Sequence, residues 1–312
     1  EQDVWKGKIP IEFSLAQVDI LSSSSPSHIY YALASRYAYL LKIAEDAIEH
    51  FQQIRLDFNS NDVLFLNSVT SQPLNSSLPI GVLFDINHIA AKDTVYNGPL
   101  PWKITITFPT VSSSSLSISS LKQSESSFFH SVKQAVALLS GSTKRFNDLS
   151  IERQRSLWTA ANQGSLDDWR HACETLQPQY LCEMKQLPVR VLLLHPSSPG
   201  PGFSLLQRPL PGLMPSSAKG FGPHHDPFLR CGRCSRCQGT PSLEGLAGGW
   251  SEEPSLRALL ALLHLPRAPE GYRCFIQGLP VSPDSPLAQL WRLLAHGDLF
   301  LYVLLFPEPA PS

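Results

Sequence analysis

The sequence lacks the features that mark several large classes of protein. Its longest apolar runs are "VRVLLLH", "ALLALLHL" and "FLYVLLF", whereas a membrane-spanning helix needs roughly 18 apolar residues or more. The formal net charge is −1 and 16% of the residues are charged, so no basic field is available to bind nucleic acid. We therefore expect neither a membrane span nor a nucleic-acid partner.

Recognisable catalytic signatures are also missing. The sequence contains no G-x-S-x-G, no H-E-x-x-H and no glycine-rich loop that could cradle a phosphate. Asp167 and Asp168 are adjacent, but they fall at the start of a predicted helix, where carboxylates suit the positive end of the helix dipole. We therefore expect no catalytic residue and no cofactor.

Cysteine is sparse except in one short segment. Of the six cysteines, Cys231, Cys234 and Cys237 lie in "CGRCSRC", just after His224 and His225. This spacing could hold Zn²⁺, although a structural zinc site usually takes a second ligand pair from a separate knuckle, and none is visible. The alternatives are an insertion that contains cysteines without a metal, or a redox pair, for which a thioredoxin-like frame is lacking. Because no export signal is apparent, we expect reduced thiols in the cytosol.

Two stretches of biased composition divide the chain. A serine-rich linker, "VSSSSLSISS", occupies 111–120, and a segment rich in Pro, Gly and Ser occupies about 211–254. We place a first domain at 1–110, a helix-rich domain at 121–185, and a further domain at 186–312 that carries the insertion at 211–254.

Hydrophobic periodicity predicts the elements of the first domain. The first strand is predicted from the alternating residues Ile9, Ile11, Phe13 and Leu15. A long helix is predicted over 30–54, followed by a strand at "DVLFLNSV", a short helix at "PIGVLFDINHI" and a strand at "PWKITITF". With a second strand before the long helix, the order is strand, strand, helix, strand, short helix, strand. This is the order of the β-grasp, the ubiquitin fold.

The last part of the chain repeats this order. "LPVRVLLLH" and "FSLLQRPL" predict a hairpin, and a helix begins at Ser255. "YRCFIQGLPV" and "FLYVLLF" predict strands, with a short helix at "PLAQLWRLLAHG" between them. The intervening residues 122–177 are helical throughout, with Gly164 separating two helices and Ser165 capping the second. The sequence therefore predicts an α+β protein with two ubiquitin-like β-grasp domains flanking a helix-rich domain.

One lysine lies in an unusual place on the first helix of the helix-rich domain, "FFHSVKQAVALL". The apolar face of this helix collects Phe128, Val132, Ala135, Val136 and Leu139. Lys133 lies ~120° from the centre of that face, at ~100° per residue. Most lysines in such positions only solvate the polar side of a helix. The alternative is that Lys133 carries a function.

Two ubiquitin-like folds raise the question whether the chain is itself a transferable modifier. Such modifiers are joined through a C-terminal glycine, whereas this sequence ends in "FPEPAPS" and has its only Gly-Gly pair, Gly248 and Gly249, inside the insertion. We therefore do not expect the chain to be a modifier. The possibility that it is a scaffold that receives one stays open.

Segments along nearly the whole chain resemble the autophagy protein 5 family, in the same order. They are "DVWKGKIPIEFSL", "YYALASRYAYLL", "LPIGVLFD", "LPWKITITF", "FFHSVKQA", "RSLWTAANQGSLDDWR" and "IQGLPVSPDSPLAQLWRLLAHGDLFLYVLLFP". The serine-rich segments and the insertion at about 211–254 have no counterpart in the family pattern. The resemblance implies the same organisation, with two ubiquitin-like domains flanking a helix-rich domain.

The resemblance also implies a function. Members of the family accept the modifier autophagy protein 12 through an isopeptide bond to one lysine, and the matching lysine here is Lys133. The conjugate binds the N-terminal helix of the coiled-coil autophagy protein 16. The complex acts like a ligase that promotes lipidation of autophagy protein 8 with phosphatidylethanolamine during autophagosome formation. The chemistry would belong to a separate conjugating enzyme, so this chain would be non-catalytic. It would be cytoplasmic and recruited peripherally to the phagophore membrane at the preautophagosomal structure.

Two rival hypotheses follow from the residues alone. One is a zinc-stabilised binding module or zinc-dependent enzyme centred on Cys231, Cys234 and Cys237. The other is a ubiquitin-like interaction protein outside autophagy. Stoichiometric zinc in the purified protein would favour the first rival. A modifier-sized gel shift in cells would exclude the second.

Overall fold

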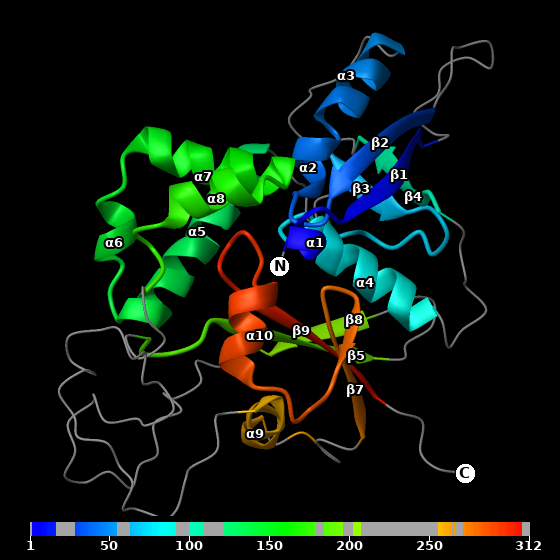
Figure 1. Cartoon of the computed structure of the whole chain (residues 1–312). Coiled ribbons are helices and arrows are strands. Elements are labelled where there is room, and N and C mark those ends of the chain that lie inside the picture. Colours follow the sequence, from blue (N-terminus) through cyan, green and yellow to red (C-terminus); the bar gives the residue numbers. More distant parts are fainter. Residues whose placement is uncertain are drawn as a thin grey trace, which may run out of the picture.

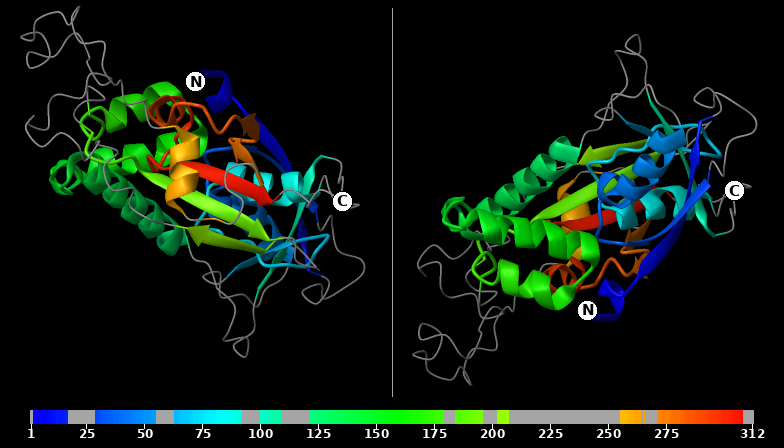
Figure 2. Two further views of the ribbon diagram at one scale, coloured as in Figure 1. Left: turned by 90° about the horizontal axis from the view of Figure 1, so that it is seen from below. Right: turned by 90° about the horizontal axis from the view of Figure 1, so that it is seen from above.

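The computed structural model describes residues 2–16, 29–54, 63–91, 100–108, 121–178, 184–195, 202–206, 255–263, 265 and 271–307. Two β-sheets with their helices form what we call the first domain (described residues up to 108) and the last domain (from 184 onward) (Figure 1). Residues 121–178 form a group of helices, which we call the helical domain. This group lies beside the two sheets in the views from below and above (Figure 2).

The first domain is built on a four-stranded sheet. Its strands are β1 (Lys8–Leu15), β2 (Ile29–Ser35), β3 (Leu64–Asn67) and β4 (Trp102–Thr107), in the order β2-β1-β4-β3. β1 pairs antiparallel with β2 and parallel with β4, and β3 pairs antiparallel with β4. Its helices are α1 (Gln2–Trp5), α2 (Leu40–Ile43), α3 (Glu45–Ile54) and α4 (Ile80–Ala91). The predictions of β1, β3, β4 and α4 are confirmed.

The helix predicted over 30–54 is wrong in its first part. Ile29–Ser35 forms β2, and helix begins only at Leu40. The spacing of apolar residues fits a helical period, but the segment also alternates, since Tyr31 and Leu33 are exposed while Ala34 is buried. Pairing with β1 over seven residue pairs decides between the two periods, because tertiary context overrides weak local preference. β2 also supplies the second strand that the predicted order requires.

The last domain is built on a five-stranded sheet. Its strands are β5 (Val189–His195), β6 (Gly202–Leu206), β7 (Tyr272–Ile276), β8 (Leu279–Val281) and β9 (Leu301–Pro307), in the order β6-β5-β9-β7-β8. Its helices are α9 (Leu256–Leu262) and α10 (Leu287–Leu294). β5 forms an antiparallel hairpin with β6 and pairs parallel with β9, as β1 does with β2 and β4. The predicted repeat of one fold in two domains is therefore confirmed.

The strand predicted at "YRCFIQGLPV" is two strands. Gln277 and Gly278 have φ values of 54° and 75°, so the backbone reverses there and β7 pairs antiparallel with β8. A two-residue turn with positive φ at both positions matches the twist of the strands that it joins. The glycine is the sequence signal for this turn, although Gln is a rare residue before it.

The helical domain consists of α5 (Leu121–Ser140), α6 (Lys144–Asn147), α7 (Ile151–Gln163) and α8 (Leu166–Cys173). Gly164 ends α7 in the left-handed region, with a φ of 70°, as predicted. Ser165 occupies the N-cap position of α8 but does not cap the helix through its side chain. Its hydroxyl donates instead to Asp168 Oδ2 at 2.5 Å.

One continuous hydrophobic core joins the three domains. The ring of Trp5 in α1 stacks on that of Tyr37 at 3.8 Å and lies 5.0 Å from that of Trp169 in α8. The indole of Trp169 donates to the carbonyl of Gly297 in the last domain at 3.0 Å. α1 therefore lies where the three domains meet (Figure 1).

No helix within the described ranges is long and apolar enough to cross a bilayer. The insertion predicted at about 211–254, including Cys231, Cys234 and Cys237, lies outside the described residues. Among the described residues, no group of three His, Cys, Asp or Glu side chains could hold a metal ion.

A first prediction concerns Asn162, a buried amide that joins the helical domain to the first domain. Its Oδ1 accepts from the backbone N–H of Tyr39 at 2.9 Å, and its Nδ2 donates to the carbonyl of Trp158 at 2.8 Å. Asn162→Ala orphans the buried N–H of Tyr39, whereas the Trp158 carbonyl keeps its helical partner within α7, so we expect a loss of about 1–3 kcal/mol of unfolding free energy. Urea denaturation measures the loss. The neighbouring exposed Gln163→Ala should change it by less than about 0.5 kcal/mol, and equal effects of the two would contradict the role of Asn162.

Candidate functional site

The helix α5 carries Lys133 as the sequence predicts. The side chains of the predicted apolar face are fully buried, namely Phe128, Val132, Ala135, Val136 and Leu139. Lys133 is exposed. Its position outside the buried face is therefore confirmed, while its role as an acceptor stays a prediction.

One flank of α5 beside Lys133 is aromatic. The Lys133 Nζ lies 5.5 Å from the centroid of the Phe146 ring, and Phe129 lies 6.2 Å from the same ring. Such a contact orients an ammonium group weakly and leaves it in water. Within the described residues, Lys133 forms no ion pair, so no carboxylate holds its amine.

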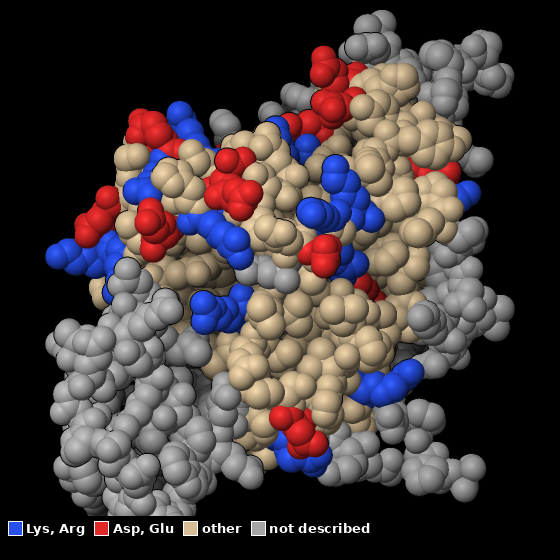
Figure 3. Space-filling model, viewed as in Figure 1, with Lys and Arg blue, Asp and Glu red and all other residues tan. Residues whose placement is uncertain are grey.

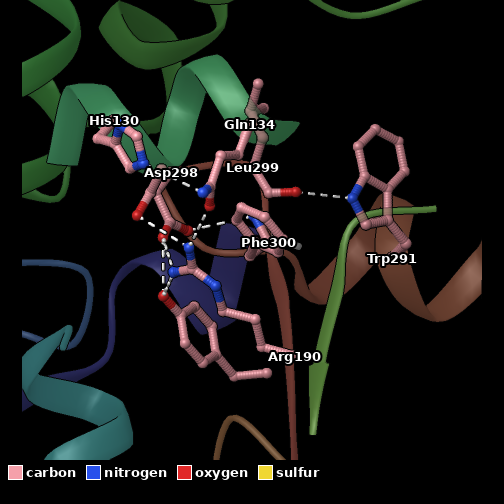
Figure 4. Close-up of polar contacts among 9 residues, drawn as sticks. His130, Gln134, Arg190, Trp291, Asp298, Leu299 and Phe300 are labelled. Atoms are coloured by element: carbon pink, nitrogen blue, oxygen red, sulfur yellow. Dashed lines mark hydrogen bonds and ion pairs between the residues drawn. The ribbon is translucent and has the colours of Figure 1, made fainter. Parts of the chain in front are cut away.

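The other flank of α5 is held by Arg190 of β5, shown in Figure 4. Its Nη2 donates to Ser131 Oγ at 3.1 Å and to Gln134 Oε1 at 3.2 Å. Its Nη1 donates to the phenol oxygen of Tyr302 at 2.7 Å and to Asp298 Oδ2 at 3.4 Å. One guanidinium therefore bonds to the helical domain through one nitrogen and to its own domain through the other.

This ionic cluster is buried. Arg190 is 8% exposed and Asp298 is 1% exposed, and the Arg190 guanidinium stacks 3.8 Å above the Phe300 ring. Burial raises the pKa of the Asp298 carboxyl, which the Arg190 charge opposes. Burial also raises the pKa of Tyr302 well above its usual value, so its hydroxyl stays protonated and donates to Asp298 at 2.8 Å.

A second ionic contact lies within the first domain, and its arginine also hydrogen-bonds to the last domain. Arg36 Nη2 bonds to Asp85 Oδ2 of α4 at 2.5 Å, and Arg36 Nε donates to the Gln277 amide oxygen at 3.5 Å. A Cβ on Gly278 would lie 3.0 Å from Asp85 Oδ1. The turn between β7 and β8 therefore needs glycine both for its positive φ and for this close approach. Nearby, burial and the charge of Arg36 lower the pKa of His296 to about 3.

Sequence analysis missed these charged residues as parts of a site. Arg190 falls in "VRVLLLH" and Asp85 in "PIGVLFDINHI", and both runs are otherwise almost wholly apolar. A charge inside such a run is the signal that could have found them, because an unpaired buried charge is very costly. The sequence does not indicate the partners.

Three family models match successive parts of the chain. They are described as the UblA domain, the alpha-helical bundle region and the UblB domain of autophagy protein ATG5, and they match residues 4–108, 121–179 and 196–305. The chain belongs to the autophagy protein 5 family. The first and last domains are accordingly the ubiquitin-like domains of this family, and they flank its helical bundle.

Known members of the autophagy protein 5 family agree with this assignment. Autophagy protein 5 of Aspergillus oryzae is 26% identical over 326 aligned residues, covering 98% of this chain and 96% of the relative. Autophagy protein 5 of Oryza sativa subsp. japonica is 26% identical over 175 residues, covering 56% of this chain and 43% of the relative. The crystal structure of Kluyveromyces marxianus Atg5 has the same fold, with a TM-score of 0.68 at 20% identity and coverage of 97% and 98% of the two chains.

A second prediction follows from Asp85. Burial raises its pKa from 3.8 to about 6, against the opposing charge of Arg36. The folded state therefore binds the proton more tightly than the unfolded state. On lowering the pH from about 7 to about 4, wild type should gain up to about 3 kcal/mol of unfolding free energy relative to Asp85→Asn. Urea denaturation across this pH range measures the gain.

Asp284 provides a control of opposite sign. It is exposed, and its hydrogen bond to Arg257 lowers its pKa. Wild type should therefore lose stability relative to Asp284→Asn as the pH falls through the pKa of the folded state. A wild-type advantage over Asp85→Asn that does not change with pH would show that Asp85 titrates normally.

Proposed function

We propose that the chain is a non-catalytic acceptor and scaffold in autophagy, which receives the ubiquitin-like modifier autophagy protein 12 at Lys133. The observation that carries the proposal is the placement of Lys133. It is exposed and has no ion pair within the described residues, yet its helix is held on both flanks. Membership of the autophagy protein 5 family supports the proposal, because it associates the chain with autophagy.

The proposed reaction needs little from this chain. The neutral amine of Lys133 attacks the thioester carbonyl that joins the modifier's C-terminus to an enzyme cysteine. A C–N bond forms, the C–S bond breaks, the thiolate leaves, and the amine nitrogen loses a proton. The conjugating enzyme provides the activated acyl group, so the acceptor only has to present its amine. An exposed lysine is sufficient, and the acceptor needs no base of its own.

The scaffold part of the proposal concerns partners. The conjugate binds the N-terminal helix of autophagy protein 16. Together they work with the conjugating enzyme that acts on autophagy protein 8 and promote its lipidation with phosphatidylethanolamine. The chain is cytoplasmic and is recruited to the phagophore membrane at the preautophagosomal structure. No nucleic acid or cofactor takes part.

A sparsely charged surface near the junction of the ubiquitin-like domains suits an apolar partner helix. Figure 3 shows few charged residues over the face that carries α4, α10 and β8 in Figure 1. Leu279 in β8 and Leu293 in α10 are 49% and 47% exposed. The Gln277 side chain donates to the carbonyl of Leu294 at 3.3 Å, which brings the two leucine-bearing segments together. Recognition of a helix by an apolar groove uses such side chains as anchors.

A third prediction concerns Lys133→Arg. Arginine keeps the charge and the contact with the Phe146 ring, so unfolding free energy should change by less than about 0.5 kcal/mol. The guanidinium cannot form the isopeptide, because it stays protonated. We therefore expect a folded protein that forms no conjugate with the modifier and does not support lipidation. A gel shift in cells and mass spectrometry of the branched peptide measure this.

Lys144→Arg is the matched control, since Lys144 is exposed in α6 of the same domain. It should conjugate like wild type. A modifier-sized shift that persists in Lys133→Arg would refute the proposed acceptor site.

A fourth prediction concerns the partner helix. The unmodified chain should bind one copy of the N-terminal helix of the coiled-coil partner, and Leu293→Asp should weaken binding by about tenfold or more, because it places a charge against an apolar anchor. Isothermal titration calorimetry measures both. Leu205→Asp is the control, since Leu205 is also exposed (45%) but lies on β6, which is at the opposite edge of the sheet from β8. Equal weakening by both substitutions would reject the surface, and no binding by the wild type would reject the scaffold function.

A further inference from the structure

The residues that flank Lys133 in sequence are held by the last domain. Ser131 lies two positions before it and Gln134 one position after it, and both accept hydrogen bonds from Arg190 Nη2. At ~100° per residue, Gln134 points about a quarter turn away from Lys133. Arg190 therefore fixes the rotation of α5 about its own axis at the level of the lysine.

The Gln134 amide has a defined orientation. Its Nε2 lies 3.1 Å from His130 Nε2, and an amide NH₂ is only a donor, so His130 is the acceptor. The amide oxygen is left to face Arg190, as Figure 4 shows. His130, one turn earlier on α5, thus holds Gln134 in the state that accepts from the guanidinium.

The guanidinium itself has little freedom to move. It stacks on Phe300, and it bonds to Tyr302 and Asp298, which are buried in the last domain. The turn that carries Asp298 is fixed in its own right, since the Trp291 indole donates to the Leu299 carbonyl at 2.8 Å. Displacing Arg190 would leave a buried carboxylate without its charge partner, which is strongly unfavourable.

The apolar face of α5 is held by other parts of the molecule. α5 packs against α6 and α7 of the helical domain and against α2 of the first domain. We propose that Arg190 is a positioning residue for the acceptor lysine, and that it acts through Ser131 and Gln134 to hold Lys133 in one orientation relative to the last ubiquitin-like domain. This inference rests on the proposed function, because it takes Lys133 as the acceptor.

The test is the double substitution Ser131→Ala/Gln134→Ala, which removes the α5 side of the contact and leaves the buried pair of Arg190 and Asp298 intact. The modifier, carried as a thioester on its purified conjugating enzyme, is mixed with increasing concentrations of the full chain. A misplaced amine should lower the rate constant of transfer at saturating chain by roughly tenfold. The half-saturating concentration should not change, because the docking surfaces are intact.

A merely structural role has a different signature. If the substitutions only destabilised the fold, a smaller fraction of the chain would be folded and able to accept the modifier. The apparent half-saturating concentration would then rise, while the rate constant at saturation would stay unchanged. The control Ser126→Ala/Ser127→Ala also truncates two polar side chains on the same helix and should leave both constants at wild-type values, because the α5 partners of Arg190 are Ser131 and Gln134. The single variant Gln134→Glu retains Ser131 and keeps a side-chain oxygen that accepts from the guanidinium. Its rate constant of transfer should therefore lie within about twofold of wild type.

The positioning role would be overturned if the double variant kept the wild-type rate constant at saturation. It would also be overturned if Gln134→Glu lowered that rate constant as much as the double variant does. These outcomes are distinct from failure of the proposed function. If Lys133→Arg still accepts the modifier, the acceptor is another residue. If Lys133→Arg abolishes transfer and the double variant transfers normally, Lys133 is the acceptor and only the role of Arg190 is lost.

Discussion

The guanidinium of Arg190 bonds to two domains at once, and the geometry around Lys133 depends on this contact. One terminal nitrogen is used by the phenol and carboxylate of Tyr302 and Asp298, and the other by the hydroxyl and amide of α5. Removing one partner of a buried ion pair is strongly destabilising, because it leaves an uncompensated charge. The last strand, the turn before it and α5 are therefore constrained together, because a shift of any one of them breaks hydrogen bonds of the same guanidinium.

The parts of the fold that the sequence predicts are those with a strong local signal. Ile9, Ile11, Phe13 and Leu15 alternate in β1 and are all buried, because one face of that strand meets the core. Gly164 marks the end of α7 because a left-handed residue is needed there. The buried face of α5 follows from helical spacing alone, and with it the exposure of Lys133.

The rest depends on contacts between distant residues. β2 carries apolar residues that satisfy a helical period and a strand period, and only its pairing with β1 selects the strand. Arg190 and Asp298 are separated by 108 positions, and Arg36 and Asp85 by 49. Local patterns can show that such a charge lies in an apolar run, but they cannot show its partner. The proposal that Lys133 is the acceptor comes from the resemblance to a family, since its exposure alone is shared by many surface lysines.

The edge position of β6 bears on how the length of this chain can change over evolution. β6 ends at Leu206 and lies at the border of its sheet, and α9 begins at Leu256 with its own cap, because Ser255 Oγ accepts from the backbone N–H of Ala258. The pairing of β6 with β5 and the cap of α9 are both made by described residues outside 207–254. The register of β5, β9 and β7 is likewise set by residue pairs outside 207–254, so a change of length between 206 and 255 does not by itself require a change of register.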